Sequence, residues 1–186
     1  MKKLTGKKLK RYKEALAKVN TYRDGLGLRV DKGIKKTVAL LNLLGHTTSA
    51  SCEGHVEVHH GTLSPWVDID FGKKNRKQKE LKLRKLIRSF WQYRYRTGAD
   101  MKITDARSLH MEDLGTGKDK QIRIVLHLEW DLFAKFKDKK KMPLPVRKWF
   151  SGEGKRAMRE FTQYLMKVYT GEERILRNPK QGIKGK

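Results

Sequence analysis

The side chains best suited to chemistry gather in one stretch of the chain, residues 46–71. This stretch contains the single cysteine, Cys52, and four of the six histidines. In Cys52-Glu53-Gly54-His55, a thiol, a carboxylate and an imidazole follow a run of small hydroxyl residues. Such a segment suits nucleophilic or general-base catalysis, binding of a small anionic ligand, or binding of a metal ion.

Residues 47–55 are expected to form a loop between a helix and a strand. Small hydroxyl side chains and a glycine let backbone N–H groups approach a phosphate or carboxylate closely. Cys52 with His55 would form a thiolate–imidazole pair, and Glu53 is an alternative general base. The structural alternative is a Ser/Thr-rich turn bonded to its own backbone, with a cysteine that is simply buried. We expect ligand contacts from Thr48, Ser49, Ser51, Gly54, Trp66 and Asp68.

A hairpin is expected after this loop, because residues alternate over 56–60 and 67–71 around a turn at 61–65. Successive side chains of a strand point to opposite faces, so one face would carry only imidazoles and carboxylates. That face holds His55, Glu57, His59, Asp68 and Asp70. One interpretation is a divalent metal site, and the other is the solvated face of a half-buried antiparallel pair. The metal ligands would be His55, His59, Asp68 and Asp70.

Helices are expected around the reactive stretch, because apolar residues recur at spacings of three and four. Asp31 is expected to cap the second helix and Asn75 the third, and a glycine follows each helix. The helices are expected at about 6–24, 32–44, 76–97 and 153–170.

The remaining elements complete the predicted fold. Residues 115–118 and 152–155 resemble parts of a phosphate-binding loop but lack its spacing, so both are expected to be turns. Two strands, a short helix and a proline-containing linker are expected at 107–114, 121–130, 131–138 and 139–145. The sequence therefore predicts an α/β or α+β fold, with a small mixed or antiparallel sheet flanked by basic helices. We expect a single domain at 1–171 and a flexible basic tail at 172–186.

The charge of the chain points to its partner. Lysine and arginine number 45 against 20 acidic residues, which gives a net charge of +25. A polyanion is the natural partner for such an excess, and the alternative is a basic protein without one. We expect nucleic acid, RNA in particular, over a membrane surface, because no basic segment has a strongly apolar opposite face. No apolar run approaches the roughly 20 residues that a bilayer span needs. One cysteine and no secretory signal predict a cytoplasmic protein.

One stripe of the third expected helix mixes arginines with aromatic residues. Guanidinium groups bind phosphates and aromatic rings stack on unpaired bases, so this mixture favours single-stranded or looped RNA. The alternative is that the two aromatic rings pack beneath another helix. The stripe consists of Arg84, Arg88, Trp91 and Tyr95.

Residues 31–58 resemble a known family. Asp31-Lys32-Gly33 precedes an apolar helix that ends near Asn42, and Thr47-Thr-Ser-Ala-Ser-Cys-Glu-Gly-His55 follows. This order is similar to that of the wybutosine-synthesis tRNA methyltransferase family. The resemblance implies an α/β RNA-modifying enzyme that uses S-adenosylmethionine. It also implies a site lined by Asp31, Ser49, Ser51, Cys52 and Gly54.

We therefore expect an RNA-binding protein that acts as a tRNA- or RNA-modifying enzyme of the methyltransferase kind. The catalytic groups would be Cys52, Glu53 and His55, with S-adenosylmethionine as cofactor. Two alternatives stay open. One is a non-enzymatic nucleic-acid or ribosome-associated binding module, and the other is a metal-dependent nuclease or hydrolase.

Overall fold

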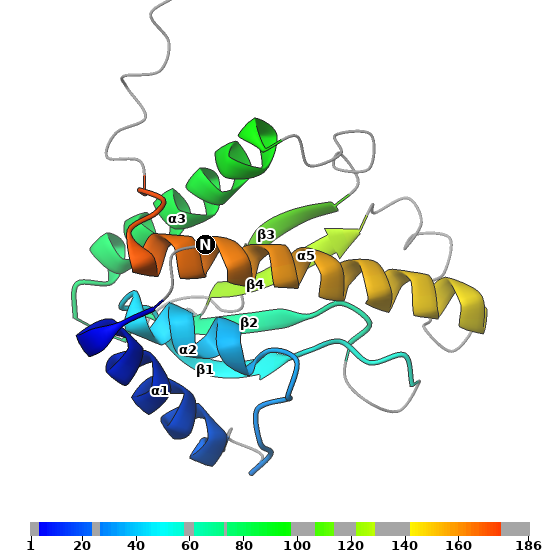
Figure 1. Ribbon diagram of the computed structural model, residues 1–186. Coiled ribbons are helices and arrows are strands. Elements are labelled where there is room, and N and C mark those ends of the chain that lie inside the picture. The colour runs from blue at the N-terminus through cyan, green and yellow to red at the C-terminus, as the bar shows by residue number, and fades with distance from the viewer. Residues whose placement is uncertain are drawn as a thin grey trace, which may run out of the picture.

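Four helices and a four-stranded sheet make up the described part of the chain (Figure 1). The computed structural model describes residues 4–23, 27–57, 62–72, 74–97, 107–113, 122–128 and 142–175. The helices are α1 Gly6–Thr21, α2 Lys35–Leu43, α3 Arg76–Arg96 and α5 Leu144–Thr170. The strands are β1 Thr47–Cys52, β2 Trp66–Asp70, β3 Arg107–Asp113 and β4 Ile122–Leu128. The expected α+β fold with a small antiparallel sheet is confirmed.

The sheet has the strand order β1-β2-β4-β3, and every neighbouring pair is antiparallel. Strand β2 lies inside the sheet, where Val67 pairs with Ser51 of β1 on one side and Ile124 of β4 on the other. Helices α2 and α5 lie side by side over the sheet, and α1 packs on α2 (Figure 1). Strand β1 is thereby an edge strand within the described sheet.

The core lies between the sheet and the helices. Val67 and Ile69 of β2 and the residues 38–41 of α2 are almost completely buried there, as is the inner face of α3. Phe90 of α3 meets Phe161 of α5 edge to face, with ring centroids 5.1 Å apart. The inner face of α3 holds Leu83, Leu86, Ile87 and Phe90, which are all buried, and Tyr93, which is partly buried.

The second helix begins later than expected, and Asp31 does not cap it. Residues 32–34 form a turn in which the Ile34 N–H donates to the backbone oxygen of Asp31 over 3.2 Å. Helix α2 then starts at Lys35, and no side chain caps its N-terminus. The carboxylate of Asp31 is thereby left to contact another segment.

The segment expected as a loop at 47–55 is a strand over most of its length, so this prediction is wrong. Thr48 is tied to the end of α2, because its N–H donates to Asn42 Oδ1 and Asn42 Nδ2 donates to its hydroxyl, each over 3.2 Å. Pairing of β1 with β2 satisfies the backbone groups that a turn would have to satisfy locally. Long-range pairing therefore decides the structure of this segment.

The predicted hairpin partner of β2 is also wrong. Val56 and Glu57 lie in a bend, and residues 58–60 are outside the described residues. Strand β2 pairs instead with β1, with Cys52 opposite Trp66. The connection between these strands is the segment 53–65, which replaces the predicted turn at 61–65.

Helix α5 begins nine residues before the predicted start at 153. Pro143 is its N-cap residue and Pro145 lies in its first turn, where a missing N–H breaks no helical hydrogen bond. The prolines thus begin a helix where a linker was predicted. Residues 152–155, predicted to be a turn, lie inside this helix.

Other predictions have mixed outcomes. Strands β3 and β4 confirm the two strands expected at 107–114 and 121–130. The expected tail still contacts the domain at its start, where Arg96 forms an ion pair of 2.9 Å with Glu173. The predictions for 115–118, 131–138, 139–141 and 176–186 lie outside the described residues. No helix among the described residues has the length and apolarity needed to cross a bilayer.

The N-terminal half of α5 holds the segment 53–65 in place. Nη1 of Arg147 donates to the backbone oxygen of Val56 over 2.9 Å. At Gly154 the helix approaches so closely that a Cβ atom would lie 2.6 Å from Cδ of Pro65. A small apolar cluster of Leu63, Met142 and Phe150 adds to this contact.

This close approach predicts opposite effects for two neighbouring glycines of α5. Gly152→Ala should raise the free energy of unfolding by about 0.5–1 kcal/mol, because alanine favours the helix and nothing lies within 4 Å. Gly154→Ala gains the same preference but overpacks Pro65, at a cost of roughly 1–3 kcal/mol, so a net loss is expected. Urea unfolding of both variants measures the difference. Equal stabilisation by the two alanines would contradict the tight contact.

Candidate functional site

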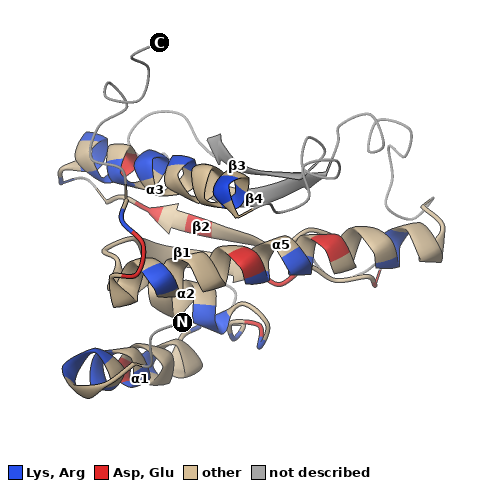
Figure 2. Cartoon of the chain, turned by 45° about the horizontal axis from the view of Figure 1, so that its top comes forward, with Lys and Arg blue, Asp and Glu red and all other residues tan. Residues whose placement is uncertain are grey.

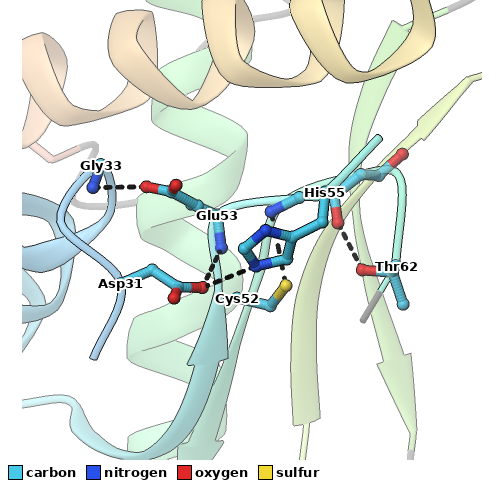
Figure 3. Close-up of polar contacts among 8 residues, drawn as sticks. Asp31, Gly33, Cys52, Glu53, His55 and Thr62 are labelled. Atoms are coloured by element: carbon cyan, nitrogen blue, oxygen red, sulfur yellow. Dashed lines mark hydrogen bonds and ion pairs between the residues drawn. The ribbon is translucent and has the colours of Figure 1, made fainter. Parts of the chain in front are cut away.

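The turn after β1 brings the thiol and the imidazole back to one place (Figure 3). Gly54 has a φ of +81°, in the left-handed region, and its N–H donates to Cys52 Sγ over 3.4 Å. A Cβ atom at Gly54 would lie 2.5 Å from the backbone oxygen of Leu63. The N–H of His55 donates to the backbone oxygen of Thr62 over 2.7 Å. Both the conformation and the available space therefore require glycine at this position.

Asp31 joins this turn from the other side of the site. Its Oδ2 accepts the Glu53 N–H over 3.0 Å and lies 3.2 Å from Nε2 of His55. Asp31, Cys52 and His55 each place one possible ligand atom within 4.8 Å of the other two. The Cys52 residue is only 6% exposed, whereas the side chains of Asp31 and His55 are 30% and 28% exposed. The thiol of this cluster is therefore shielded from solvent, whereas its carboxylate and imidazole are partly exposed.

Glu53 points away from this cluster (Figure 3). Its Oε2 accepts the N–H of Gly33 over 2.5 Å. The side chain also borders a pocket of about 100 Å³, together with Lys155 and Arg159 of α5. The other lining residues are Gly33, Ile34, Pro65 and Met158. Glu53 thereby belongs both to the turn and to a pocket with two positively charged residues at its border.

The residues predicted to contact a ligand from β1 and β2 do not line this pocket. Thr48 and Asp68 are buried, and the backbone oxygen of Ser49 accepts the hydroxyl of Tyr22 over 2.6 Å. Ser51 and Trp66 are partly buried in the paired strands β1 and β2. Pairing of β1 with β2 fixes the orientation of these side chains, and the same pairing makes a strand of the predicted loop. Only Asp31, Cys52, Glu53, Gly54 and His55 of the predicted catalytic and ligand residues come together around the turn.

The predicted metal set is wrong for two of its members. Asp68 and Asp70 lie along β2 opposite Ala50 and Thr47, and Asp70 accepts the Gly72 N–H over 2.7 Å. Within the part of the chain that the structure describes, the group whose geometry could hold a metal ion consists of Asp31, Cys52 and His55 instead. His59, the fourth predicted ligand, lies outside the described residues. The predicted face required β2 to pair with 56–60, whereas the two strands that flank β2 are β1 and β4.

Two features of the site were missed in the sequence: the cations from α5, and the combination of Asp31 with Cys52 and His55 as possible metal ligands. Lys155 and Arg159 come from α5, about a hundred residues after the turn, and the sequence contains no local signal that joins them to it. Two of the three possible metal ligands did have a local signal in the sequence, which is their spacing. Cys52 and His55 are separated by two residues, one of them glycine, which matches the short spacing of ligand pairs across a turn.

His46, at the opposite end of β1, is not part of the site. Its residue is buried, and its backbone N–H donates to the oxygen of Leu41 over 2.9 Å. Burial, with the positive charge of Lys82, lowers the pKa of His46 to about 4. His46 is therefore neutral at pH 7 and acts as a core residue between α2 and β1.

The basic and aromatic stripe of α3 is largely open to solvent. Arg84, Arg88 and Tyr95 are exposed, and Tyr95 is 70% accessible. Trp91 is half-buried and tilted against Phe90, with ring centroids 6.0 Å apart. Arg84 pairs with Glu80 across one helical turn over 2.6 Å, a surface contact that another anion can replace at small cost. Figure 2 shows lysines and arginines along this helix.

Comparison with models of protein families, with curated proteins and with solved structures finds no match to this chain. The resemblance of residues 31–58 to the wybutosine-synthesis family therefore stays a prediction.

Two glycines with positive φ predict how much the turn at Gly54 depends on close packing. Gly45→Ala should lower the free energy of unfolding by about 1 kcal/mol, because its φ is +87° but nothing lies within 4 Å. Gly54→Ala adds a contact with the Leu63 oxygen to the same conformational cost, and a loss on the order of 3 kcal/mol is expected. Urea unfolding measures both values. Losses of the same size would show that space does not matter at Gly54.

Proposed function

We propose that the protein binds RNA and modifies it at the centre formed by Asp31, Cys52, Glu53 and His55. One observation carries this proposal. The pocket that Glu53 borders also has Lys155 and Arg159 among its lining residues, so one carboxylate of the turn and two cations border the same small space. A phosphate held by the two cations would place the neighbouring nucleotide against the turn.

The charge of the whole molecule supports RNA as the substrate. The net charge is +25, and lysines and arginines are exposed on helices far from the pocket. Such a distribution attracts a long polyanion from several sides and releases its counterions on binding. A small anionic metabolite would need cations only near the pocket. Binding of such a metabolite would give no role to the exposed basic residues of α1, which are Lys7, Lys10, Lys13 and Lys18.

The stripe on α3 supports single-stranded or looped RNA over a regular duplex. Tyr95 exposes most of its ring, and Arg88 is exposed on the same face of the helix. Unpaired bases stack on aromatic rings, whereas the bases of an intact duplex are already stacked. A tRNA offers such unpaired bases in its loops.

The reactive groups have separate roles in this proposal. Asp31 orients the imidazole of His55, as a carboxylate commonly does for a catalytic histidine. Glu53 is the carboxylate nearest to a group bound in the pocket, and its role is that of a general base. The pocket of about 100 Å³ is small beside the roughly 300–1,000 Å³ of typical ligand sites, so it suits a phosphate or part of a nucleotide. S-adenosylmethionine stays a prediction of the sequence resemblance.

RNA binding by the pocket is tested with a matched pair of double variants on α5. Lys155→Ala with Arg159→Ala removes the two cations of the pocket, and Lys148→Ala with Arg156→Ala removes two exposed cations elsewhere on the helix. The pocket variant should weaken binding of labelled bulk tRNA on the order of tenfold and reduce the salt slope by about 1.4, for two single-strand phosphate contacts. The control variant should change both values much less. Fluorescence anisotropy at several salt concentrations measures both.

Two outcomes would contradict RNA binding at the pocket. Equal effects of the two double variants would mean that the pocket takes no part in binding. Affinity for tRNA that does not depend on salt would contradict an electrostatic RNA interface altogether.

Modification is tested separately from binding. Bulk tRNA is incubated with the protein, with and without S-adenosylmethionine, and its nucleosides are analysed by mass spectrometry. We expect a changed nucleoside that disappears with Glu53→Gln and His55→Gln. Unchanged nucleosides, with RNA binding that is indifferent to both variants, would indicate a non-enzymatic binding module. Shortened RNA would indicate a nuclease.

A further inference from the structure

We infer that Asp31, Cys52 and His55 bind one zinc ion through three protein ligands and leave its fourth position open. The role of this ion in RNA modification rests on the proposed function, but binding of the ion does not depend on RNA. The three side chains come from two segments that the turn at Gly54 and the start of α2 hold together.

The distances among the three side chains suit this ion. Bonds of 2.0–2.3 Å in a tetrahedral arrangement place the ligand atoms of zinc about 3.3–3.6 Å apart. The Asp31 Oδ2 to His55 Nε2 distance is 3.2 Å, and the three ligand atoms all lie within 4.8 Å of one another. Small side-chain movements therefore complete the coordination. The spacing of Cys52 and His55, with two residues between them, is of the kind that ligand pairs use to hold zinc across a turn.

Backbone groups around the cluster already orient two of the ligands. The Gly54 N–H donates to Cys52 Sγ over 3.4 Å, a contact that fixes the position of the sulfur. The Glu53 N–H donates to Asp31 Oδ2, the oxygen that faces His55. Such outer contacts fix metal ligands before the ion arrives and reduce the cost of ordering them.

The kinds of ligand atom select the ion. Sulfur and imidazole nitrogen favour zinc, whereas magnesium and calcium take oxygen ligands almost alone. A thiolate and a carboxylate also neutralise the two charges of the ion. This neutralisation matters in a chain with a net charge of +25, because uncompensated cations would be repelled.

Exposure favours a metal ligand over a nucleophile for Cys52. Its residue is 6% exposed, so a nucleotide cannot reach the sulfur, while Asp31 and His55 keep about a third of their side-chain surface. A zinc ion bound between them would turn its open position toward that surface. Three protein ligands with one open position is the arrangement of catalytic zinc sites.

Zinc loading of purified protein tests the inference. After removal of metals with a chelator and dialysis against zinc, elemental analysis should find about one zinc per chain. Asp31→Asn, Cys52→Ser and His55→Gln should each raise the zinc Kd at least about tenfold, in the range of lost coordination contacts. Glu53→Gln is the matched control. Glutamine keeps a side-chain oxygen that can accept the Gly33 N–H, and this side chain is not one of the three proposed ligands, so zinc binding should be unchanged.

A cobalt spectrum shows which atom holds the ion. Cobalt in place of zinc should give a thiolate charge-transfer band, and this band should be missing from Cys52→Ser. Circular dichroism of the metal-free variants confirms that each one is folded. Absence of zinc from the wild type would overturn the inference, and so would equal zinc in the wild type, Asp31→Asn and Cys52→Ser. The measurements use no RNA, so their failure is distinguishable from failure of the proposed function.

Discussion

The site depends on two hydrogen bonds between residues 31–33 and residues 53–55, in each of which a carboxylate of one segment accepts a backbone N–H of the other. Asp31 accepts the Glu53 N–H over 3.0 Å, and Glu53 accepts the Gly33 N–H over 2.5 Å. Each segment thus satisfies a backbone donor of the other, as the two side chains of a capping box do within one helix. A Cβ atom at Gly33 would collide with the Glu53 carboxylate, so glycine permits this approach. The crossed pair joins the start of α2 to the end of β1 and leaves Asp31 facing His55.

The periodic parts of the fold were predictable because their signals are local. The inner stripe of α3 and the alternation in β4 each follow from neighbouring residues. The start of α5 is not predicted, because two prolines close together indicate a linker, although Pro143 and Pro145 are well tolerated at the N-cap and in the first helical turn. Strand β1 was missed for another reason: its serines and threonines form turns as readily as strands, and only pairing with β2 decides between them.

The site was partly predictable, to the extent that its residues are close in the sequence. Cys52, Glu53 and His55 lie on one turn, so their nearness follows from the chain itself. Asp31 was expected at the site only through the family resemblance, while its helix-capping pattern pointed elsewhere. Asp68 and Asp70 were assigned to a metal site because the wrong partner was assumed for β2. The contribution of Lys155 and Arg159 depends on how α5 crosses the segment 53–65, which no local pattern predicts.

The acidic groups at the turn lie within a strongly basic protein, and this arrangement determines where a polyanion can approach. Asp31, Cys52 and Glu53 form an island of acidic and weakly acidic groups in a chain that carries a net charge of +25. A polyanion is therefore attracted to the surroundings of this island but not to its centre, unless a cation is bound there. A zinc ion at the cluster would neutralise the carboxylate of Asp31 and the thiolate of Cys52 and so remove that obstacle. The same ion would explain why a basic protein keeps a partly exposed carboxylate beside a buried thiol, which a purely phosphate-binding surface does not require.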